Sequence, residues 1–405
     1  MTNSRRSTRR APRALPNGVR RGAALVVTLV CLVALGLVAA GGFAASQQSY
    51  RGGRNALVEQ RAFGVAEYGL NLRMAKWDPA LNVPPVAGGF PIGAVNDSMV
   101  AVFNGDTARV RVTRLDNMLY WIESIGRASI PNPNLQATRD VSAFVRLAYP
   151  TIQPRGAVMA DGDVQVNGSG TINGNDVLPY AGTANQWDST KCSTMRGPGL
   201  PAVDVPPGAK VIAGPNNITS SPAVQRDALA ADSNSYVRFG TESWITLTNN
   251  ASIKLPSGVY NQNIGPVDSS GTCVDTPYNW GEPFRSANDL APSCYERFPI
   301  IYVNGNLTLN GNGRGQGILL VNGSLEIDGT FDFSGLIIVR DDVNKGTGTA
   351  TITGAILARN INLSTGGSNF TGNQFVQYSK CAVESALRGS AVLRPVRERS
   401  WAQLF

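Results

Sequence analysis

"VRRGAALVVTLVCLVALGLVAAGGFAAS" spans residues 19–46 and joins two arginines and a glycine directly to a long uncharged segment. From Ala23 to Ala45 there are 23 residues without a charge. A helix of that length spans roughly 34 Å, enough to cross the apolar core of a bilayer. The apolar part of a cleavable secretory signal is only about 7–15 residues long, so the length favours a retained membrane helix. A conventional signal-peptidase site after Ala40 or Ala44 is the alternative.

The basic charge of the chain is concentrated ahead of this helix. Of the 36 basic residues, seven arginines lie within the first 22 residues, which contain no acidic residue. The rest of the chain has 29 basic against 28 acidic residues, although the whole has a net charge of +8. We therefore expect the leader to stay in the cytoplasm and everything after residue 45 to lie outside the inner membrane. The composition gives no support for binding nucleic acid.

The residue types present also limit the chemistry. The 405 residues include 44 glycines and 24 prolines, which favours turn-rich β structure over helical bundles. There is no histidine, which excludes Ser-His-Asp and Cys-His nucleophiles and every histidine-based metal site. We expect no catalytic residues, no metal and no cofactor.

Four cysteines follow the membrane segment, whereas Cys31 lies inside it. The four are Cys192, Cys273, Cys294 and Cys381, without CxxC spacing. An even number of exported cysteines predicts two disulfides, with three possible pairings. The Pro-, Asn- and Gly-rich loop 274–293 would suit a local Cys273–Cys294 bridge, which leaves Cys192 for Cys381. Unpaired buried thiols are the alternative.

The junction at Gly22 resembles the class III signal of type IV pilins and pseudopilins. The resemblance implies that a prepilin peptidase cuts after Gly22 and methylates Ala23, leaving the apolar helix as the assembly element. Major pilins have a glutamate at mature position five, where this chain has Val27. PilX-type minor pilins and the tip pseudopilin of type II secretion often lack it too.

Two further stretches resemble PilX-type proteins. "QRAFGVAEYGLNLRM" (60–74) is similar to the "AF-x-AAEAGL" stretch that follows their anchor. The matching positions are Ala62, Phe63, Ala66, Glu67, Gly69 and Leu70. "IESIGRA" (122–128) resembles the strand ending "STGRA". These matches imply the pilin architecture, a long helix lying on a small antiparallel sheet, over residues 20–150. For Glu67, a solvated helix face is the simpler interpretation.

The same region also has its own periodicity. Leu57 or Val58, then Arg61, Val65, Tyr68 and Leu72, recur at helical spacing and predict an amphipathic continuation of the helix. Strand-like alternation follows in "MVAVFN" (99–104), "ARVRVTRL" (108–115), "NMLYWIESIG" (117–126) and "DVSAFVRLAYP" (140–150).

The second half contains a repeat. Four segments superpose: "PIIYVNGNLTLNG" (299–311), "GILLVNGSLEIDG" (317–329), "GLIIVRDDVNKG" (335–346) and "GAILARNINLSTGG" (354–367). Their period is 18–19 residues, and "VMADGDVQVNG" (158–168) fits the same frame. Two short strands per repeat with Gly/Asn/Asp turns predict coils of a parallel β-helix. Ile301, Leu319, Ile337 and Ile356 should then stack in one inward column, and Asn304 and Asn322 could form an Asn ladder. An antiparallel sandwich is the alternative, and we expect residues 170–298 to be irregular.

The predicted fold is mostly β with a long N-terminal α-helix: a pilin-like helix plus small antiparallel sheet, followed by a parallel β-helix-like solenoid. The predicted parts are a basic leader (1–22), a transmembrane helix (23–45), its continuation (46–76), a small antiparallel domain (77–155), a β-helix-like ectodomain with loops (156–376) and a C-terminal cap and tail (377–405). A short helix around Cys381 should cap the open end of the solenoid. The tail with Trp401 and Phe405 is either packing material, which we favour, or a docking strand.

Three functions remain open. The first is a PilX-type minor pilin that uses its helix to assemble with other pilins or pseudopilins, after processing by prepilin peptidase, and displays its ectodomain for initiation, adhesion or surface contact. The second is a membrane-anchored β-helical polysaccharide enzyme, with candidate carboxylates at Asp341 and Asp342 beside Arg340, and at Asp161 and Asp163. The third is an envelope scaffold unrelated to pili. We favour the first, which is not an enzyme. It would start at the inner membrane and could enter a pilus at the cell surface.

Overall fold

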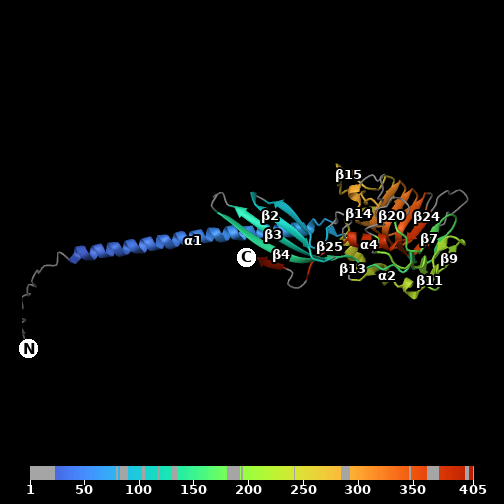
Figure 1. Cartoon of the computed structure of the whole chain (residues 1–405), viewed down its shortest axis with the longest axis horizontal. Helices are drawn as coiled ribbons and strands as arrows, with labels where there is room; N and C mark the ends of the chain where they lie inside the picture. The colour runs from blue at the N-terminus through green and yellow to red at the C-terminus, as the bar shows by residue number, and fades with distance from the viewer. Residues whose placement is uncertain are drawn as a thin grey trace, which may run out of the picture.

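Three parts follow one another along the long axis of the molecule. The computed structural model describes residues 23–78, 81–82, 90–102, 105–116, 118–129, 135–179, 192, 195–240, 242–283, 292–345, 348–362, 374–396 and 401–404. Helix α1 (Ala23–Ala75) leads into a small antiparallel sheet, and a large solenoid of parallel strands lies at the far end (Figure 1). The predicted fold class is confirmed.

Helix α1 has two different environments along its 53 residues. Its large apolar side chains before Tyr50 are more than half exposed. From residue 58 onward one stripe is buried against the sheet, and it consists of Val58, Ala62, Val65, Ala66 and Leu70. This is the spacing of one helical face. The predicted stripe is confirmed in part: Val58 and Val65 are buried, whereas Leu57 and Tyr68 remain 59% and 47% exposed, and the small residues Ala62 and Ala66 face the sheet instead.

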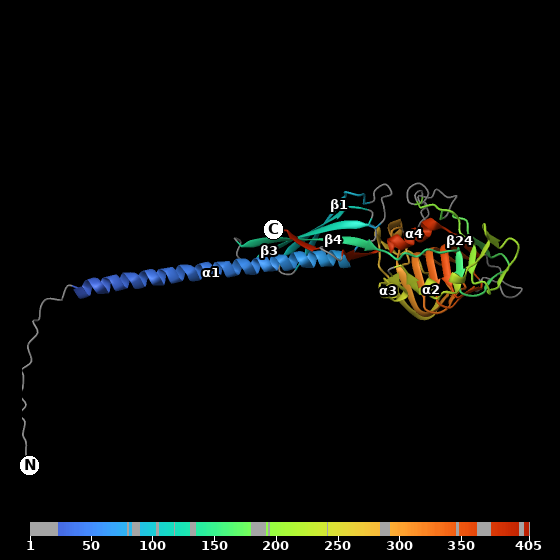
Figure 2. The ribbon, with the colours of Figure 1, turned by 90° about the horizontal axis from the view of Figure 1, so that it is seen from below.

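The antiparallel sheet combines the predicted strands with the C-terminus of the chain. Its strands are β1 (Val95–Ala101), β2 (Thr107–Arg114), β3 (Leu119–Ser129), β4 (Gln136–Ala148), β25 (Val392–Pro395) and β26 (Trp401–Leu404). The order is β1-β2-β3-β4, and β25 and β26 both pair with the outer edge of β4. Figure 2 shows α1 along one face of this sheet. The C-terminal tail thus adds two strands to the antiparallel sheet of its own chain, whereas we favoured a packing role without strand pairing. Phe405 lies outside the described residues.

The solenoid has three ladders of parallel strands, where the sequence predicted two strands per repeat. The first contains β14 (Ile253–Tyr260), β17 (Ile300–Leu309), β18 (Gly313–Val321), β20 (Phe331–Val339), β22 (Ala350–Ala358), β5 (Val158–Ala160), β8 (Val203–Val205) and β11 (Val224–Arg226). The second continues from β17 through β19 (Leu325–Ile327), β21 (Asp342–Lys345), β23 (Asn360–Asn362), β6 (Val164–Val166) and β9 (Val211–Ala213). The third joins the first halves of β18, β20 and β22 to β24 (Gln374–Tyr378), β7 (Thr171–Asn173) and β10 (Ile218–Thr219).

Glycines form the corner between the third and first ladders. Gly317, Gly335 and Gly354 are paired in register and have φ of +108°, +138° and +144°. Such angles are strained for any residue with a Cβ, so the chain can bend here within one continuous strand.

The predicted inward column is present in the first ladder. Ile301, Leu319, Ile337 and Ile356 are partners in register, and none has exposed surface. Pairing extends the column to Ile253 at one end and to Val158, Val203 and Val224 at the other. These residues belong to the apolar interior of the solenoid, together with the side chains of the other ladders.

The coils do not stack in the order of the sequence. The chain enters at β5, which pairs with β22, nearly 200 residues later, and then moves outward through β8 to β11. It returns to the opposite end at β14 and winds back through β17, β18 and β20 to β22. The first coil of the solenoid in sequence is therefore an inner coil of the stack.

Helices cover the outer side of the first ladder. These are α2 (Asn234–Val237), α3 (Trp244–Asn249) and α4 (Lys380–Gly389), and they share a second apolar cluster with the outward side chains of β18, β20 and β22. Helix α4 lies against these central strands, so the prediction that it caps an open end is wrong. Near β14 the interior is closed by Trp280, which has no exposed surface and meets the Phe331 ring edge-on. The remaining short elements are η4 (Ala228–Ala231), η5 (Pro292–Cys294) and the pairs β12 (Arg238–Phe239) with β13 (Glu242–Ser243) and β15 (Asp268–Ser269) with β16 (Thr272–Cys273).

Candidate functional site

The first half of α1 is an apolar surface without a protein partner in the described chain. The helix Ala24–Ala75 is the one described helix that is long and apolar enough to cross a membrane. Ala23 is the first residue of α1, and Val27, at the position of the pilin glutamate, is 60% exposed. Gly22 and the rest of the leader lie outside the described residues. An exposed apolar surface of this kind is compatible with contact to lipid or to other apolar helices.

The two stretches that resemble PilX-type proteins form opposite sides of one interface. Ala66 and Gly69 of the helix motif face the sheet, where Gly126 lies in the "IESIGRA" strand. A Cβ at Gly126 would lie 2.9 Å from Ala66 Cα, and a Cβ at Gly69 would lie 2.6 Å from Ala108 Cβ. Both distances are below van der Waals contact, so the helix and the sheet approach this closely only because the residues are small. Leu70 is buried at the end of the same face.

Charged groups fix α1 at the margins of this interface. Arg61 Nε lies 2.6 Å from Asp106 Oδ2, and Asp106 Oδ1 accepts a hydrogen bond of 3.2 Å from the backbone N–H of Ser129. The Asp106 side chain is only 3% exposed, whereas that of Arg61 is 31% exposed, so the carboxylate is shielded from solvent and the guanidinium only partly. Glu67 is exposed, as the simpler interpretation predicted.

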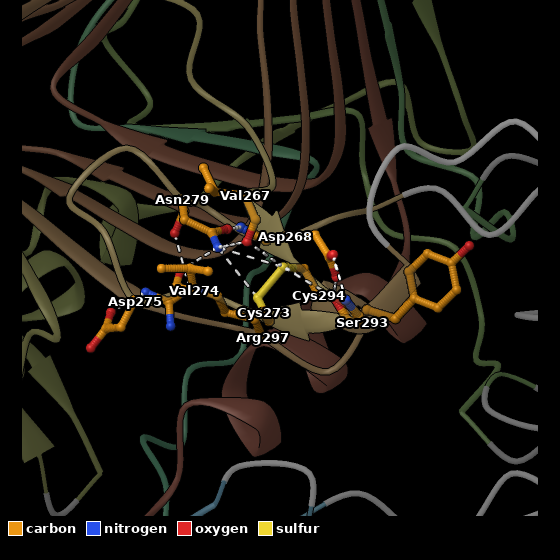
Figure 3. Close-up of a disulfide and its surroundings, with 12 residues drawn as sticks. Val267, Asp268, Cys273, Val274, Asp275, Asn279, Ser293, Cys294 and Arg297 are labelled. Carbon is orange, nitrogen blue, oxygen red and sulfur yellow. Dashed lines mark hydrogen bonds and ion pairs between the residues drawn. A yellow bond between two sulfur atoms is a disulfide. The ribbon is translucent and has the colours of Figure 1, made fainter.

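Both disulfides join the expected cysteines. Cys192–Cys381 ties a segment before β8 to α4, and both residues are buried. Cys273–Cys294 closes the loop before β17 (Figure 3). Inside that loop the fully buried Asn279 donates through Nδ2 to the carbonyls of Val267 (3.0 Å) and Val274 (2.6 Å). Cys31 is a free thiol on the exposed part of α1.

Most candidate carboxylates participate in coil stacking. The two aspartate pairs are far apart in the sequence but lie only two coils apart in the stack, on either side of the coil that contains Asn360. The sequence reasoning missed this proximity because it assumed sequential coils. Asn360 donates to Asp342 Oδ1 at 2.8 Å and accepts from the Asp163 N–H at 3.0 Å. Asp163 Oδ1 in turn accepts from the Lys210 N–H at 2.7 Å. Asp341 lies 3.8 Å from Arg359, and burial raises the pKa of the Asp161 carboxyl.

A second row of side chains joins the coils at the end of the first ladder. Asn322 Nδ2 donates to Asn304 Oδ1 at 3.3 Å, as the predicted Asn ladder requires. Arg340 continues the row by donating to Asn322 Oδ1 at 3.1 Å, and its guanidinium lies 5.7 Å from the centre of the Trp244 ring. Arg340 therefore connects the ladder to α3 and does not approach Asp342 in any interaction described. Among the described residues no group of His, Cys, Asp or Glu side chains could hold a metal ion.

Sequence reasoning missed the contacts between the sheet and the solenoid. Arg394 of β25 lies 2.8 Å from Glu242, which is only 4% exposed, and Asn82 donates to the Ala391 carbonyl at 3.2 Å. These residues come from three separate parts of the chain, and no spacing signals their proximity.

Comparison with known proteins gives a structural match of low overall similarity. No protein-family model and no curated protein matches the chain. Among solved structures, the crystal structure of the competence-associated pilin ComZ from Thermus thermophilus matches at 12% identity, over 86% of this chain and 96% of that chain, with a TM-score of 0.24. The architecture described above therefore rests on the strand pairing and helix contacts of this chain.

Proposed function

We propose that the chain is a PilX-type minor pilin, processed by prepilin peptidase and inserted through α1 among other pilin subunits, which presents its solenoid for pilus initiation, adhesion or surface contact. The observation that carries the proposal is the division of α1 into an exposed apolar half and a half docked on the sheet through small residues. An apolar helix anchored at one end to a folded head can leave the bilayer by exchanging lipid contacts for contacts with neighbouring helices.

The position of the solenoid supports display. It lies at the opposite end of the molecule from the start of α1 (Figure 1), so a subunit held by the first half of α1 would present the solenoid away from the membrane. We propose a display role rather than a catalytic one, since the carboxylates of Asp163 and Asp342 accept hydrogen bonds from neighbouring coils. Carboxylates whose oxygens already accept hydrogen bonds between coils are poorly placed to exchange protons with a substrate.

The decisive experiment is mapping of the mature N-terminus by mass spectrometry on membrane-extracted and filament fractions. We expect N-methylated Ala23 as the first residue. Gly22→Glu should leave the leader attached and exclude the protein from sheared filaments, whereas Gly22→Ala should be processed at least in part. A mature start at Gly41 or Ala45 would establish a conventional secreted protein. An uncut Met1 on a stable membrane protein would favour an envelope scaffold.

A further inference from the structure

The loop between β14 and β17 is fixed to the side of the solenoid. Ile264 pairs with Gly313 in parallel, and the Arg314 N–H donates to the Ile264 carbonyl at 2.9 Å. Further along, the Gln316 N–H donates to the Trp280 carbonyl at 2.8 Å. The loop thus continues the sheet beyond the edge of β18, and its position is set by backbone hydrogen bonds.

A buried amide and a disulfide hold the far arm of the loop. Gln316 has no exposed surface, and its Nε2 donates to the carbonyls of Tyr295 (2.8 Å) and Arg297 (2.9 Å). The Cys273–Cys294 bond closes the same loop (Figure 3). The loop between β14 and β17 is therefore a rigid wall on this side of the solenoid. A wall fixed by covalent and buried polar contacts loses little conformational freedom when a ligand binds against it.

A groove of about 470 Å³ lies between this wall and the outer side of the third ladder. Its polar lining is supplied by Asn263, Asn312, Arg314, Thr330 and Asp332. Arg314 and Asp332 are register partners on β18 and β20. The groove therefore offers amide, hydroxyl, guanidinium and carboxyl groups side by side on a rigid floor.

A buried carboxylate orients Arg314. Arg314 Nη1 lies 3.4 Å from Glu282 Oε1, and Glu282 has no exposed surface. The backbone N–H of Glu282 donates to the Cys294 carbonyl at 3.2 Å, so the loop closed by the Cys273–Cys294 disulfide positions the Glu282 carboxylate. With two carboxyl groups near one guanidinium, the groove has no excess of positive charge. This disfavours an acidic ligand and suits one that is rich in hydroxyl groups.

An exposed aromatic ring continues the row beyond the groove. In register, Asp332 pairs with Thr351 and Thr351 with Phe375. Side chains in register on parallel strands leave the same face, and each step is about 4.8 Å, so Phe375 lies about 10 Å from Asp332. Phe375 is 43% exposed. A pyranose ring has an apolar face of C–H groups and a rim of hydroxyls, which suits a flat ring flanked by polar side chains.

We propose that this row, from Arg314 and Asp332 to Phe375, binds a neutral oligosaccharide, with one sugar hydrogen-bonded in the groove and a neighbouring sugar stacked on Phe375. The proposal adds a ligand class to the display role and does not depend on assembly into a filament.

The test is calorimetric titration of the full chain in dodecylphosphocholine, a detergent without a sugar headgroup, with chitohexaose, maltohexaose and hexagalacturonate. At least one neutral hexamer should bind saturably and more tightly than hexagalacturonate. Phe375→Ala changes an exposed residue and should weaken that binding at least tenfold, as should Asp332→Asn. The control Glu326→Gln alters an exposed carboxylate on the second ladder and should bind like wild type.

Circular dichroism would establish that the variants keep the fold. The proposal is wrong if neither neutral hexamer binds, if hexagalacturonate binds most tightly, or if folded Phe375→Ala binds as well as wild type. None of these results bears on the mature N-terminus, so the ligand and the pilin assignment fail separately.

Discussion

Two glycines of α1 should respond in opposite directions to the same substitution. At Gly64 nothing lies within 4 Å of an added Cβ, so Gly64→Ala should stabilise the helix by about 0.5–1 kcal/mol through backbone propensity alone. At Gly69, five residues later, the added Cβ would lie 2.6 Å from Ala108 Cβ and 3.2 Å from Val110 Cγ2. Ordinary carbon contacts are about 3.5–4.0 Å, so the helix and sheet must separate.

The size of the difference follows from the atoms involved. The Cβ at Gly69 would also lie 2.7 Å from Ser124 Oγ, and that hydroxyl has no hydrogen-bond partner to lose if it rotates away. Ala108 Cβ is fixed by the backbone of β2 and cannot rotate. Overpacking of this kind costs about 1–3 kcal/mol, which outweighs the propensity gain. We expect Gly69→Ala to be less stable than Gly64→Ala by about 2 kcal/mol.

Hydrogen exchange of the full chain in detergent micelles, followed by mass spectrometry of peptides from β2 and β3, measures this difference directly. A change of about 2 kcal/mol corresponds to roughly thirtyfold in the exchange rate of amides that open with the sheet. Equal protection in the two variants, or greater protection in Gly69→Ala, would refute the close helix–sheet packing on which the pilin-like architecture depends.

Three further outcomes test the solenoid. Ile337→Asp places an unpaired carboxylate in the inward column and should abolish the cooperative unfolding transition in urea, whereas Asp341→Asn with Asp342→Asn should unfold like wild type because Asn keeps the oxygen that accepts from Asn360. Replacing Cys192 and Cys381 by Ser should lower the free energy of unfolding by about 2 kcal/mol more than replacing Cys273 and Cys294. The reason is that loop-closure entropy grows with the length of the closed loop, and the two disulfides join residues 189 and 21 positions apart. Equal losses of stability in the two double variants would contradict this prediction. Burial raises the pKa of Asp332 in the folded state, so the protonated carboxyl contributes its full stability below the unfolded-state pKa, and this contribution is lost as pH rises through the folded-state pKa. In wild type the melting temperature should therefore fall as pH is raised from about 4, and Asp332→Asn should remove that fall. The same pH profile in wild type and variant would contradict the prediction.

The parts of the fold that could be predicted are those that follow from the regular spacing of apolar residues along the sequence. The 18-residue spacing of the repeats places Ile301, Leu319 and Ile337 in one column because parallel coils of equal length keep register. The buried stripe of α1 was predicted only in part. Periodicity found Val58 and Val65 but also selected the large residue Tyr68, whereas close approach to the sheet selects Ala66 and Gly69. The resemblance to PilX-type proteins singled out those small residues, and the structure supplies the physical reason for them.

The parts that could not be predicted depend on which distant segments meet. The inner position of Val158 requires Ile356 on one side and Val203 on the other, and no property of the three residues encodes that order. The same holds for the C-terminus: α4 is apolar enough for either an open end or a flank, and its place is decided by the apolar outer side of β18, β20 and β22. Because α4 leads directly into β25, the residues that cover the solenoid also complete the sheet that holds α1. The solenoid and the sheet that holds α1 are thus completed by one C-terminal segment, so substitutions between α4 and β25 should affect the stability of both.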